Sequence, residues 1–179
     1  MNLTPVIDVV ERDLKEAAVI LGCGKTVWED LDKIGSPLLS CDIMATNWAI
    51  PFYFGKPLCH AVSLHGELLD KWVDLRVGLL KDKPPMIHSA NLRPGAIANC
   101  VWASDMYPPL SGIFAIWISD QLGYKKIYLC GMSLQGGYFW EPSHSHQYAA
   151  NINFSQYYGT IPWEKIAYSS PSFRARFLP

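Results

Sequence analysis

The chain of 179 residues carries a net charge of −1, with 15 Lys and Arg against 16 Asp and Glu, and half of its residues are hydrophobic. This length suits one domain with a substantial core, and the lack of basic clusters argues against nucleic acid as a partner. Five scattered cysteines without a C-x-x-C pair argue against a disulfide framework and a structural zinc site.

The apolar runs are short, and none approaches the roughly 20 residues that a membrane-spanning helix needs. The N-terminal stretch MNLTPVIDVVERDLKE is acidic where a signal peptide is basic and then apolar. We therefore expect a cytoplasmic protein without a transmembrane segment.

Apolar runs rich in β-branched residues alternate with longer amphipathic runs along the chain. In chain order, the pattern predicts a strand over 17–23, a helix over 26–34, strands over 38–46 and 58–64, a helix over 65–80, a strand over 85–90, a helix over 111–124, and strands over 125–132 and 164–171. Gly123 is placed to end the helix over 111–124.

Strands that alternate with helices are joined by crossovers, which produce a largely parallel sheet covered on both faces. The sequence thus predicts an α/β, Rossmann-like three-layer fold in a single domain over 1–179. The segments 91–110 and 131–163 look irregular, and long loops in a compact domain are more often functional than not, so 131–163 is a candidate loop or lid region. Ligands of such sheets bind at the carboxyl ends of the strands, where the turn at 22–26 and Asn47 should meet.

The stretch AAVILGCGKT (17–26) ends like a phosphate-binding P-loop but does not fit that motif. The pattern G-x-x-x-x-G-K-[ST] needs a glycine where Val19 stands, and the dinucleotide pattern G-x-G-x-x-G fails at Val27. Gly22 and Gly24 in a strand-to-helix turn still allow backbone N–H groups to approach a phosphate at a helix N-terminus. A tight structural turn explains the two glycines equally well.

Four segments together resemble one family. They are ILGCGKTVWEDLD (20–32), ATNWAIPFYFGKPLCHAV (45–62), PLSGIFAIWISDQLGYKKIYLCGMSL (109–134) and EKIAYSSP (164–171). In order and approximate spacing they are similar to the bacterial sialyltransferases that modify lipooligosaccharides. The Gly-x-Gly turn and the Gly-Tyr-Lys strand also recur in the 6-hydroxymethylpterin diphosphokinase-like family, so the resemblance supports a fold better than a reaction.

The resemblance implies a set of residues that bind a nucleotide or nucleotide-sugar. These are Gly22, Cys23, Gly24 and Thr26 at the phosphate, Asn47 at the nucleotide or donor, Ser111 and Gly112 facing the donor at the start of a helix, and Ser133 in place of an Asp that contacts ribose. Cys23 and Lys25 replace an Asn and a Pro of the family, so several nucleotide contacts differ.

Transfer of a glycosyl group needs a base that activates the acceptor hydroxyl, and histidine suits this task near neutral pH. The family carries a histidine after its fifth strand, where EPSHSHQY (141–148) offers His144 and His146 as catalytic candidates. Either is equally explained as an ordinary loop residue. His65, just after a predicted strand, is a second candidate.

Other titratable residues are expected to be structural. His60 and His88 lie within predicted strands and should belong to the core or its edge. The DLD at 30–32 imitates a metal-binding D-x-D motif but lies inside a predicted helix, where we expect a solvated face. No metal site is expected.

The sequence therefore predicts a nucleotide- or nucleotide-sugar-binding protein, glycosyltransferase-like, with a CMP-linked sugar as donor substrate, a glycan as acceptor, and no cofactor. Two alternatives stay open. One is a pterin-type pyrophosphokinase, which needs Mg²⁺ and carboxylates such as Asp42 or Asp105 near the glycine turn. The other is a degenerate, non-catalytic ligand-binding module. The many aromatic residues also leave a homo-oligomer open.

Overall fold

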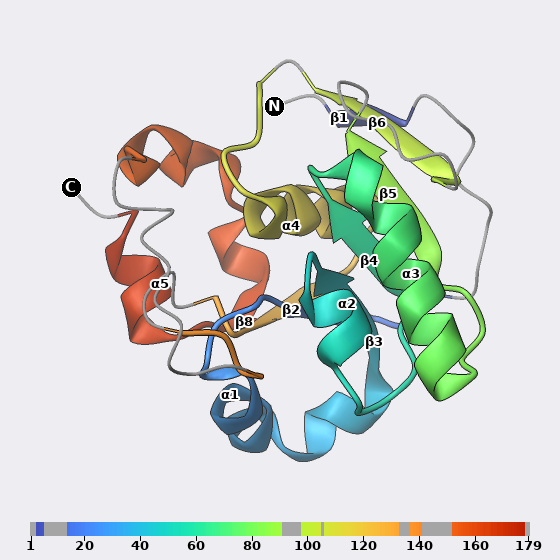
Figure 1. Cartoon of the computed structure of the whole chain (residues 1–179). Helices are drawn as coiled ribbons and strands as arrows, with labels where there is room; N and C mark the ends of the chain where they lie inside the picture. Colours follow the sequence, from blue (N-terminus) through green and yellow to red (C-terminus); the bar gives the residue numbers. More distant parts are fainter. Residues whose placement is uncertain are drawn as a thin grey trace.

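An eight-stranded sheet runs through the centre of the molecule (Figure 1). Its spatial order is β1-β6-β5-β4-β3-β2-β7-β8, and every neighbouring pair is parallel except β1 with β6. This computed structural model describes residues 3–5, 14–90, 98–104, 106–132, 137–140 and 152–177.

The helices and strands are bounded as follows. The strands are β1 (Leu3–Pro5), β2 (Ala17–Leu21), β3 (Cys41–Thr46), β4 (His60–Ser63), β5 (Met86–Ala90), β6 (Cys100–Ser104), β7 (Lys126–Cys130) and β8 (Ile166–Tyr168). The helices are α1 (Val27–Ile34), α2 (Ala49–Phe52), α3 (Gly66–Leu80), α4 (Ser111–Gln121) and α5 (Pro171–Ala175), with 3₁₀ turns η1 (Ser36–Ser40), η2 (Phe154–Thr160) and η3 (Trp163–Lys165).

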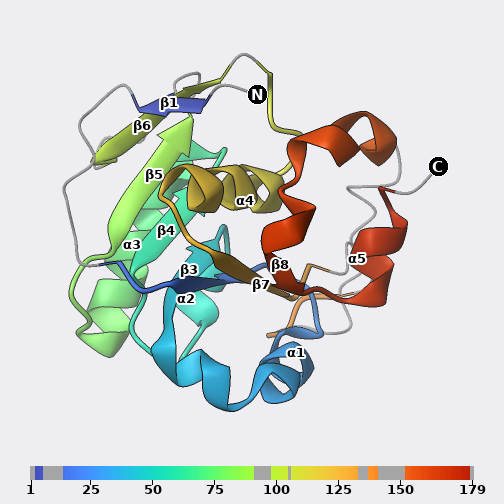
Figure 2. The same cartoon turned by 180° about the vertical axis from the view of Figure 1, so that it is seen from behind.

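Helices cover both faces of the sheet, which confirms the predicted three-layer α/β fold. The face that carries α1, α2 and α3 has its own apolar core, and α4 packs in a second core on the other face. The C-terminal 3₁₀ turns η2 and η3, drawn in orange to red, lie beside α4 in both views, and α5 lies farther from it (Figure 2). Their aromatic residues join the α4 core.

Strand β2 is the centre of this arrangement. All five of its residues are buried, and it pairs with β3 on one side and β7 on the other. The chain builds outward from β2 through β3, β4, β5 and β6, and then returns to add β7 and β8 on the opposite side. The carboxyl ends of β2 and β7 therefore form the topological switch point, where open α/β sheets bind ligands.

The segment 91–110, expected to be irregular, contains a strand that the sequence prediction missed. β6 pairs in parallel with β5 and antiparallel with β1, which was also missed. Both strands are short, and such runs give no clear periodic signal. The second predicted strand also begins later than expected, at Cys41, because Pro37 opens the 3₁₀ turn η1.

Helix α4 ends as predicted. Gly123 has a left-handed φ of +86°, and its N–H donates to the Asp120 carbonyl at 3.1 Å. The N–H of Tyr124 donates to the Ser119 carbonyl at 3.2 Å, which completes a Schellman motif. This turn aims Tyr124 back toward the sheet, where it is buried.

A glycine is needed at position 22 because the residues that follow β2 and β7 contact each other directly. The Gly22 N–H donates to the Cys130 carbonyl at 2.8 Å, and a Cβ at this position would lie 2.5 Å from the Gly131 carbonyl oxygen. The Gly131 oxygen belongs to the backbone, so it cannot move aside for a methyl group as the end of a flexible side chain can.

We predict that Gly22→Ala lowers the free energy of unfolding by about 2 kcal/mol, because the added methyl group overpacks the contact between the two strand ends. The control is Gly78→Ala on the exposed side of α3, where a Cβ meets nothing within 4 Å. That change should raise stability by about 0.5 kcal/mol through helix propensity. Urea denaturation measures both, and equal effects would contradict the packing argument.

Candidate functional site

The carboxyl edge of the sheet brings several of the predicted site residues together. The Thr46 hydroxyl donates to the Leu21 carbonyl at 3.1 Å, which ties the ends of β2 and β3. The Cys23 thiol donates to the Thr46 carbonyl at 3.5 Å. The Leu64 N–H donates to the Ser111 hydroxyl at 3.1 Å, which ties the end of β4 to the start of α4.

Three backbone N–H groups of the glycine turn at 22–26 are bonded within the protein. Besides the Gly22 bond to β7, the Gly24 N–H donates to the Gly131 carbonyl at 2.8 Å, and the Lys25 N–H donates to the Gly137 carbonyl at 3.0 Å. N–H groups that face a phosphate in a phosphate-binding turn are here bonded to carbonyl oxygens. A phosphate that used them would first have to displace these bonds.

Residues 137–140, which we call the strap, lie against this turn. Tyr138 forms an antiparallel bridge with Gly24, and the Phe139 N–H donates to the Cys23 carbonyl at 3.2 Å. Two rings fasten the strap to neighbouring elements: Phe139 lies edge-on to Trp28 of α1, and Trp140 stacks on the α2 ring of Phe52 at a centroid distance of 4.9 Å.

The strap belongs to a larger aromatic cluster that the sequence analysis did not place. Its other members are Trp28, Trp48, Phe52, Tyr53 and Trp72. The signal was present in the dense aromatic runs NWAIPFYF and GYFW, but their juxtaposition depends on contacts between distant segments. Trp28 and Trp48 remain 44% and 40% exposed, so part of this aromatic surface borders the carboxyl edge.

The Cys23 side chain is a neutral, half-buried thiol. Burial raises the pKa of Cys23 to about 12, against a lesser opposing effect of hydrogen bonds from the Ala49 and Trp48 backbone. A thiol in this state is a poor nucleophile, because the thiolate is the reactive form. Cys23 therefore takes part in packing the turn rather than in covalent chemistry.

Asp30 is buried, with 2% of its surface exposed, which corrects the expectation of a solvated face for this residue of the DLD at 30–32; Asp32 is exposed as expected. Its Oδ2 accepts from the Thr26 hydroxyl at 2.8 Å and from the Gly131 N–H at 2.9 Å. Its Oδ1 accepts from the Tyr168 hydroxyl at 2.7 Å. The Thr26 hydroxyl thus donates its hydrogen to Asp30, so this hydrogen is not available to a ligand.

Asn47 has the most distinctive geometry at this edge. Its φ is +49°, a left-handed conformation that Asn adopts more readily than most residues but that is still uncommon. Its Oδ1 accepts from the Ser63 hydroxyl at 2.6 Å, and that hydroxyl oxygen in turn accepts from the His65 N–H at 2.9 Å. The arrangement fixes the amide orientation. Within the described part of the chain, the Asn47 Nδ2 group has no hydrogen-bond acceptor.

Of the remaining predicted site residues, Ser111, Gly112 and His65 are described by the structure. Ser111 is buried, and Gly112 packs against Met132, whose terminal methyl would collide with an added Cβ. The Nδ1 of His65 lies 3.5 Å from the Glu67 carboxylate, and the side chain is 46% exposed. The predicted residues Ser133, His144 and His146 lie outside the described residues.

Of the two carboxylates considered as Mg²⁺ ligands, the one that the structure describes lies away from the glycine turn. Asp42 is buried near the amino end of β3, where it accepts a hydrogen bond from Tyr124 at 2.9 Å. Asp105 lies outside the described residues. Among residues that the structure describes, no three His, Cys, Asp or Glu side chains are grouped to hold a metal ion.

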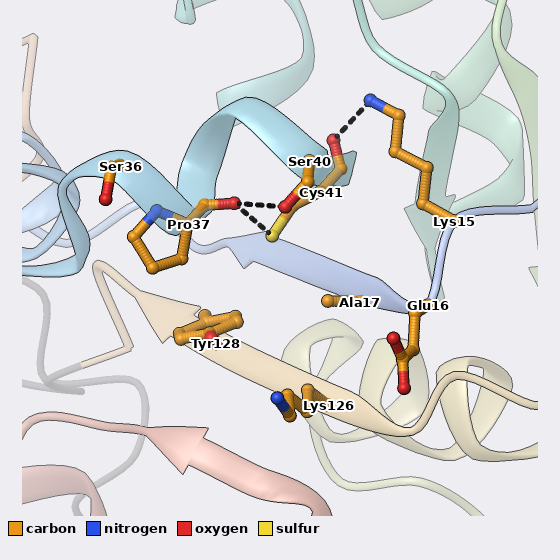
Figure 3. A pocket seen from close by; sticks show the side chains of 9 residues that line it. All are labelled: Lys15, Glu16, Ala17, Ser36, Pro37, Ser40, Cys41, Lys126 and Tyr128. Carbon is orange, nitrogen blue, oxygen red and sulfur yellow. Dashed lines mark hydrogen bonds between the residues drawn. The ribbon is translucent and has the colours of Figure 1, made fainter.

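A shallow groove of about 630 Å³ lies at the opposite, amino edge of the strands (Figure 3). It is lined by Lys15, Glu16, Ala17, Ser36, Pro37, Ser40, Cys41, Lys126 and Tyr128. The Lys15 ammonium donates one hydrogen bond to the Cys41 carbonyl at 3.1 Å. None of the predicted site residues lines this groove, so it is separate from the candidate site.

We predict that Asp30→Asn destabilises the fold by about 2 kcal/mol or more. The amide NH₂ would face at least one of the three donors that now bond to the carboxylate, and a buried donor without an acceptor is costly. Tyr168→Phe removes a single donor and should cost about 1 kcal/mol. Urea denaturation of the two variants tests this order, and an Asp30→Asn variant as stable as wild type would contradict the structural role of this carboxylate.

We predict that Trp140→Ala loosens the strap, because the stacking on Phe52 is lost. The amide hydrogen of Lys25, bonded to the strap at Gly137, should then exchange with solvent faster, whereas that of Gly22, bonded to β7, should not change. Trp163→Ala in the C-terminal aromatic group is the control. Equal exchange at Lys25 in Trp140→Ala and wild type would show that the ring does not hold the strap.

The search for relatives of this chain returns no match: no family model fits the sequence, and no curated protein or solved structure is significantly similar to it. The resemblance to the sialyltransferases therefore stays a prediction. Among the helices in the described ranges, none is long and apolar enough to cross a membrane.

Proposed function

We propose that the carboxyl edge of the sheet around Asn47 and the glycine turn binds a nucleotide or nucleotide-sugar. The observation that carries the proposal is the Asn47 amide: it stands at a strand end in an uncommon backbone conformation, and Ser63 orients it so that its NH₂ group is free to donate. Backbone outliers of this kind gather at functional sites. The switch point between β2 and β7 lies beside it.

The groups at this edge suit an anionic, ring-containing ligand. The Asn47 NH₂ donates to a phosphate oxygen, and the exposed ammonium of Lys25 supplies positive charge beside the N-terminus of α1. The partly exposed rings of Trp28 and Trp48 offer flat apolar surfaces for a base or a sugar. Such a mixture of apolar walls with a few oriented polar groups is typical of ligand sites.

The reaction that we propose for this site is transfer of a sugar from a CMP-linked donor to a glycan hydroxyl. The acceptor oxygen bonds to the anomeric carbon, the bond from that carbon to the phosphate oxygen breaks, and CMP leaves. A histidine takes the hydroxyl proton. His65 is the histidine that the described ranges place at this edge, and His144 and His146 remain the candidates from the sequence. A CMP leaving group does not require a metal ion for this step.

A second candidate function is ligand binding without catalysis. It is favoured by the hydrogen bonds of the glycine turn, whose Gly24 and Lys25 N–H groups already bond to protein carbonyls. A ligand held only by the Asn47 amide and the aromatic surfaces would leave these bonds intact. Calorimetric titration with CMP, CMP-sialic acid, ATP–Mg²⁺ and S-adenosylmethionine separates the ligand classes, and hydrolysis of the bound CMP-sugar or transfer to lactose separates enzyme from binding module.

We predict that Asn47→Asp weakens binding of CMP by about 10-fold to 100-fold, because a donor to a charged oxygen is replaced by a repelling carboxylate. Aspartate keeps the acceptor for Ser63 and tolerates the left-handed backbone, so the fold should not change. The affinity is measured by isothermal calorimetry.

The matched control is Asn99→Asp at the amino edge of the sheet. Asn99 Oδ1 accepts from the Ile87 N–H at 2.7 Å, a bond that aspartate retains, so this variant makes the same chemical change away from the site. Equal affinity for CMP in wild type and both variants would remove Asn47 from the site. Absence of binding to all four ligands at millimolar concentration would refute the proposed function.

A further inference from the structure

A line of hydrogen-bonded side chains crosses the α4 face of the sheet inside the core. Its members come from four adjacent strands and from the turn after α4, and all are 5% exposed or less. They are Asp42 of β3, Tyr124 after α4, His60 of β4, His88 of β5 and Trp102 of β6. The two histidines are fully buried, which confirms that they belong to the core.

The bonds connect these residues end to end. Trp102 Nε1 lies 2.9 Å from His88 Nδ1, and His88 Nε2 lies 2.9 Å from His60 Nδ1. His60 Nε2 lies 2.8 Å from the Tyr124 hydroxyl, which lies 2.9 Å from Asp42 Oδ2. Both nitrogens of each imidazole ring are therefore engaged by side chains of the chain itself.

Only one arrangement of hydrogens satisfies every bond. The indole N–H of Trp102 can only donate, so His88 Nδ1 accepts and the ring carries its hydrogen on Nε2. This hydrogen is donated to His60 Nδ1, so His60 also carries its hydrogen on Nε2 and donates it to the Tyr124 oxygen. The Tyr124 hydrogen is donated to Asp42. Both imidazoles are thus neutral, and both are Nε2–H tautomers.

An additional proton has no place in this line. On His88 it would sit on Nδ1 and face the indole N–H of Trp102, and on His60 it would sit on Nδ1 and face the N–H of His88. Either position puts two donors against each other at 2.9 Å. The folded chain can take up such a proton only by breaking the line.

The described neighbours of the rings have bonds and partners of their own. Asp42 already accepts from the Lys15 backbone N–H at 2.9 Å and from the Cys59 thiol at 3.3 Å. Burial raises the pKa of Cys59, and burial together with Asp42 raises that of Tyr124, so both stay uncharged at neutral pH. From β6, Cys100 pairs in register with His88, and the α4 hydroxyl of Ser119 donates to its own helix at Ala115.

We propose that this line is an acid-sensitive lock that holds the C-terminal end of α4 on the sheet. A histidine in the unfolded chain takes up a proton near pH 6.5, whereas His60 and His88 in the folded chain do not. The unfolded state therefore binds more protons as the pH falls, and the stability that is present above pH 6.5 is lost below it. The lock is independent of the ligand proposed for the carboxyl edge.

The measurable consequence is a steep loss of stability in mild acid. With two histidines excluded from protonation, the unfolding equilibrium constant should rise about 100-fold between pH 8 and pH 5.5. Trp102→Gln replaces the indole donor by an amide whose oxygen can accept the hydrogen of a protonated His88 Nδ1. This variant should be less stable than wild type at pH 8, but its unfolding equilibrium constant should rise about tenfold less between pH 8 and pH 5.5.

The matched control is Trp117→Gln. Trp117 is 1% exposed in the same core, and its indole N–H donates to the Thr160 hydroxyl at 3.2 Å, so the same substitution removes a comparable bond without touching a histidine. The rise of its unfolding equilibrium constant in acid should equal that of wild type. Urea denaturation at a series of pH values measures all three proteins, and an equal rise in Trp102→Gln and wild type would overturn the proposal.

Long-range ¹H–¹⁵N correlation spectra of ¹⁵N-histidine-labelled wild type supply a second readout that does not depend on the folding of a variant. His60 and His88 should both appear as neutral Nε2–H tautomers at pH 7.5 and keep that form in the folded protein at pH 6. A folded-state ring in the Nδ1–H form, or one that carries two N–H groups at pH 6, would overturn the lock.

Discussion

The carboxyl edge of the sheet depends on one buried carboxylate. Asp30 accepts from Thr26, Gly131 and Tyr168, so a single side chain fixes the glycine turn, the exit of β7 and the strand β8. Because a buried charge is stable only while its hydrogen bonds persist, these three segments cannot separate without a large cost. The geometry of the switch point is therefore set by α1 before a ligand arrives.

The contacts of Asp30 determine which groups at the edge can act. They hold Gly131 where its carbonyl accepts from Gly24, and the strap accepts from Lys25, so these two N–H groups of the glycine turn are bonded within the protein. Gly22 is explained by close packing of two strand exits, without a phosphate. Among the described side chains of this edge, the Asn47 amide keeps its NH₂ group available, since Ser63 engages only its oxygen, and Lys25 presents an exposed ammonium. Side chains, rather than the turn, are thus the groups that define the candidate site.

The sequence predicted the features that a local residue pattern determines. It did not predict the features that depend on contacts between residues far apart in the chain. Buried runs located β2 and β7, and Gly123 located the end of α4. On α1, Val27, Asp30, Leu31 and Ile34 share the buried face, so helical spacing already pointed Asp30 inward. The expectation of a solvated face failed because the donors that make this burial tolerable come from residues 131 and 168. The strap and the aromatic cluster were missed for the same reason.

Helix α4 links the two polar systems of the molecule. At its first residue the Ser111 hydroxyl accepts from Leu64 at the candidate edge, and just beyond its last turn Tyr124 joins the line of buried side chains. Its residues from Ser111 to Ser119 are all buried, so the helix has little freedom to slide or rotate without disturbing the core. A ligand that contacts the start of α4 therefore meets a support anchored at both ends. For the ligand proposed at this edge, recognition would come from fit to a preformed surface, with the partly exposed rings of Trp28 and Trp48 as the parts that can adjust.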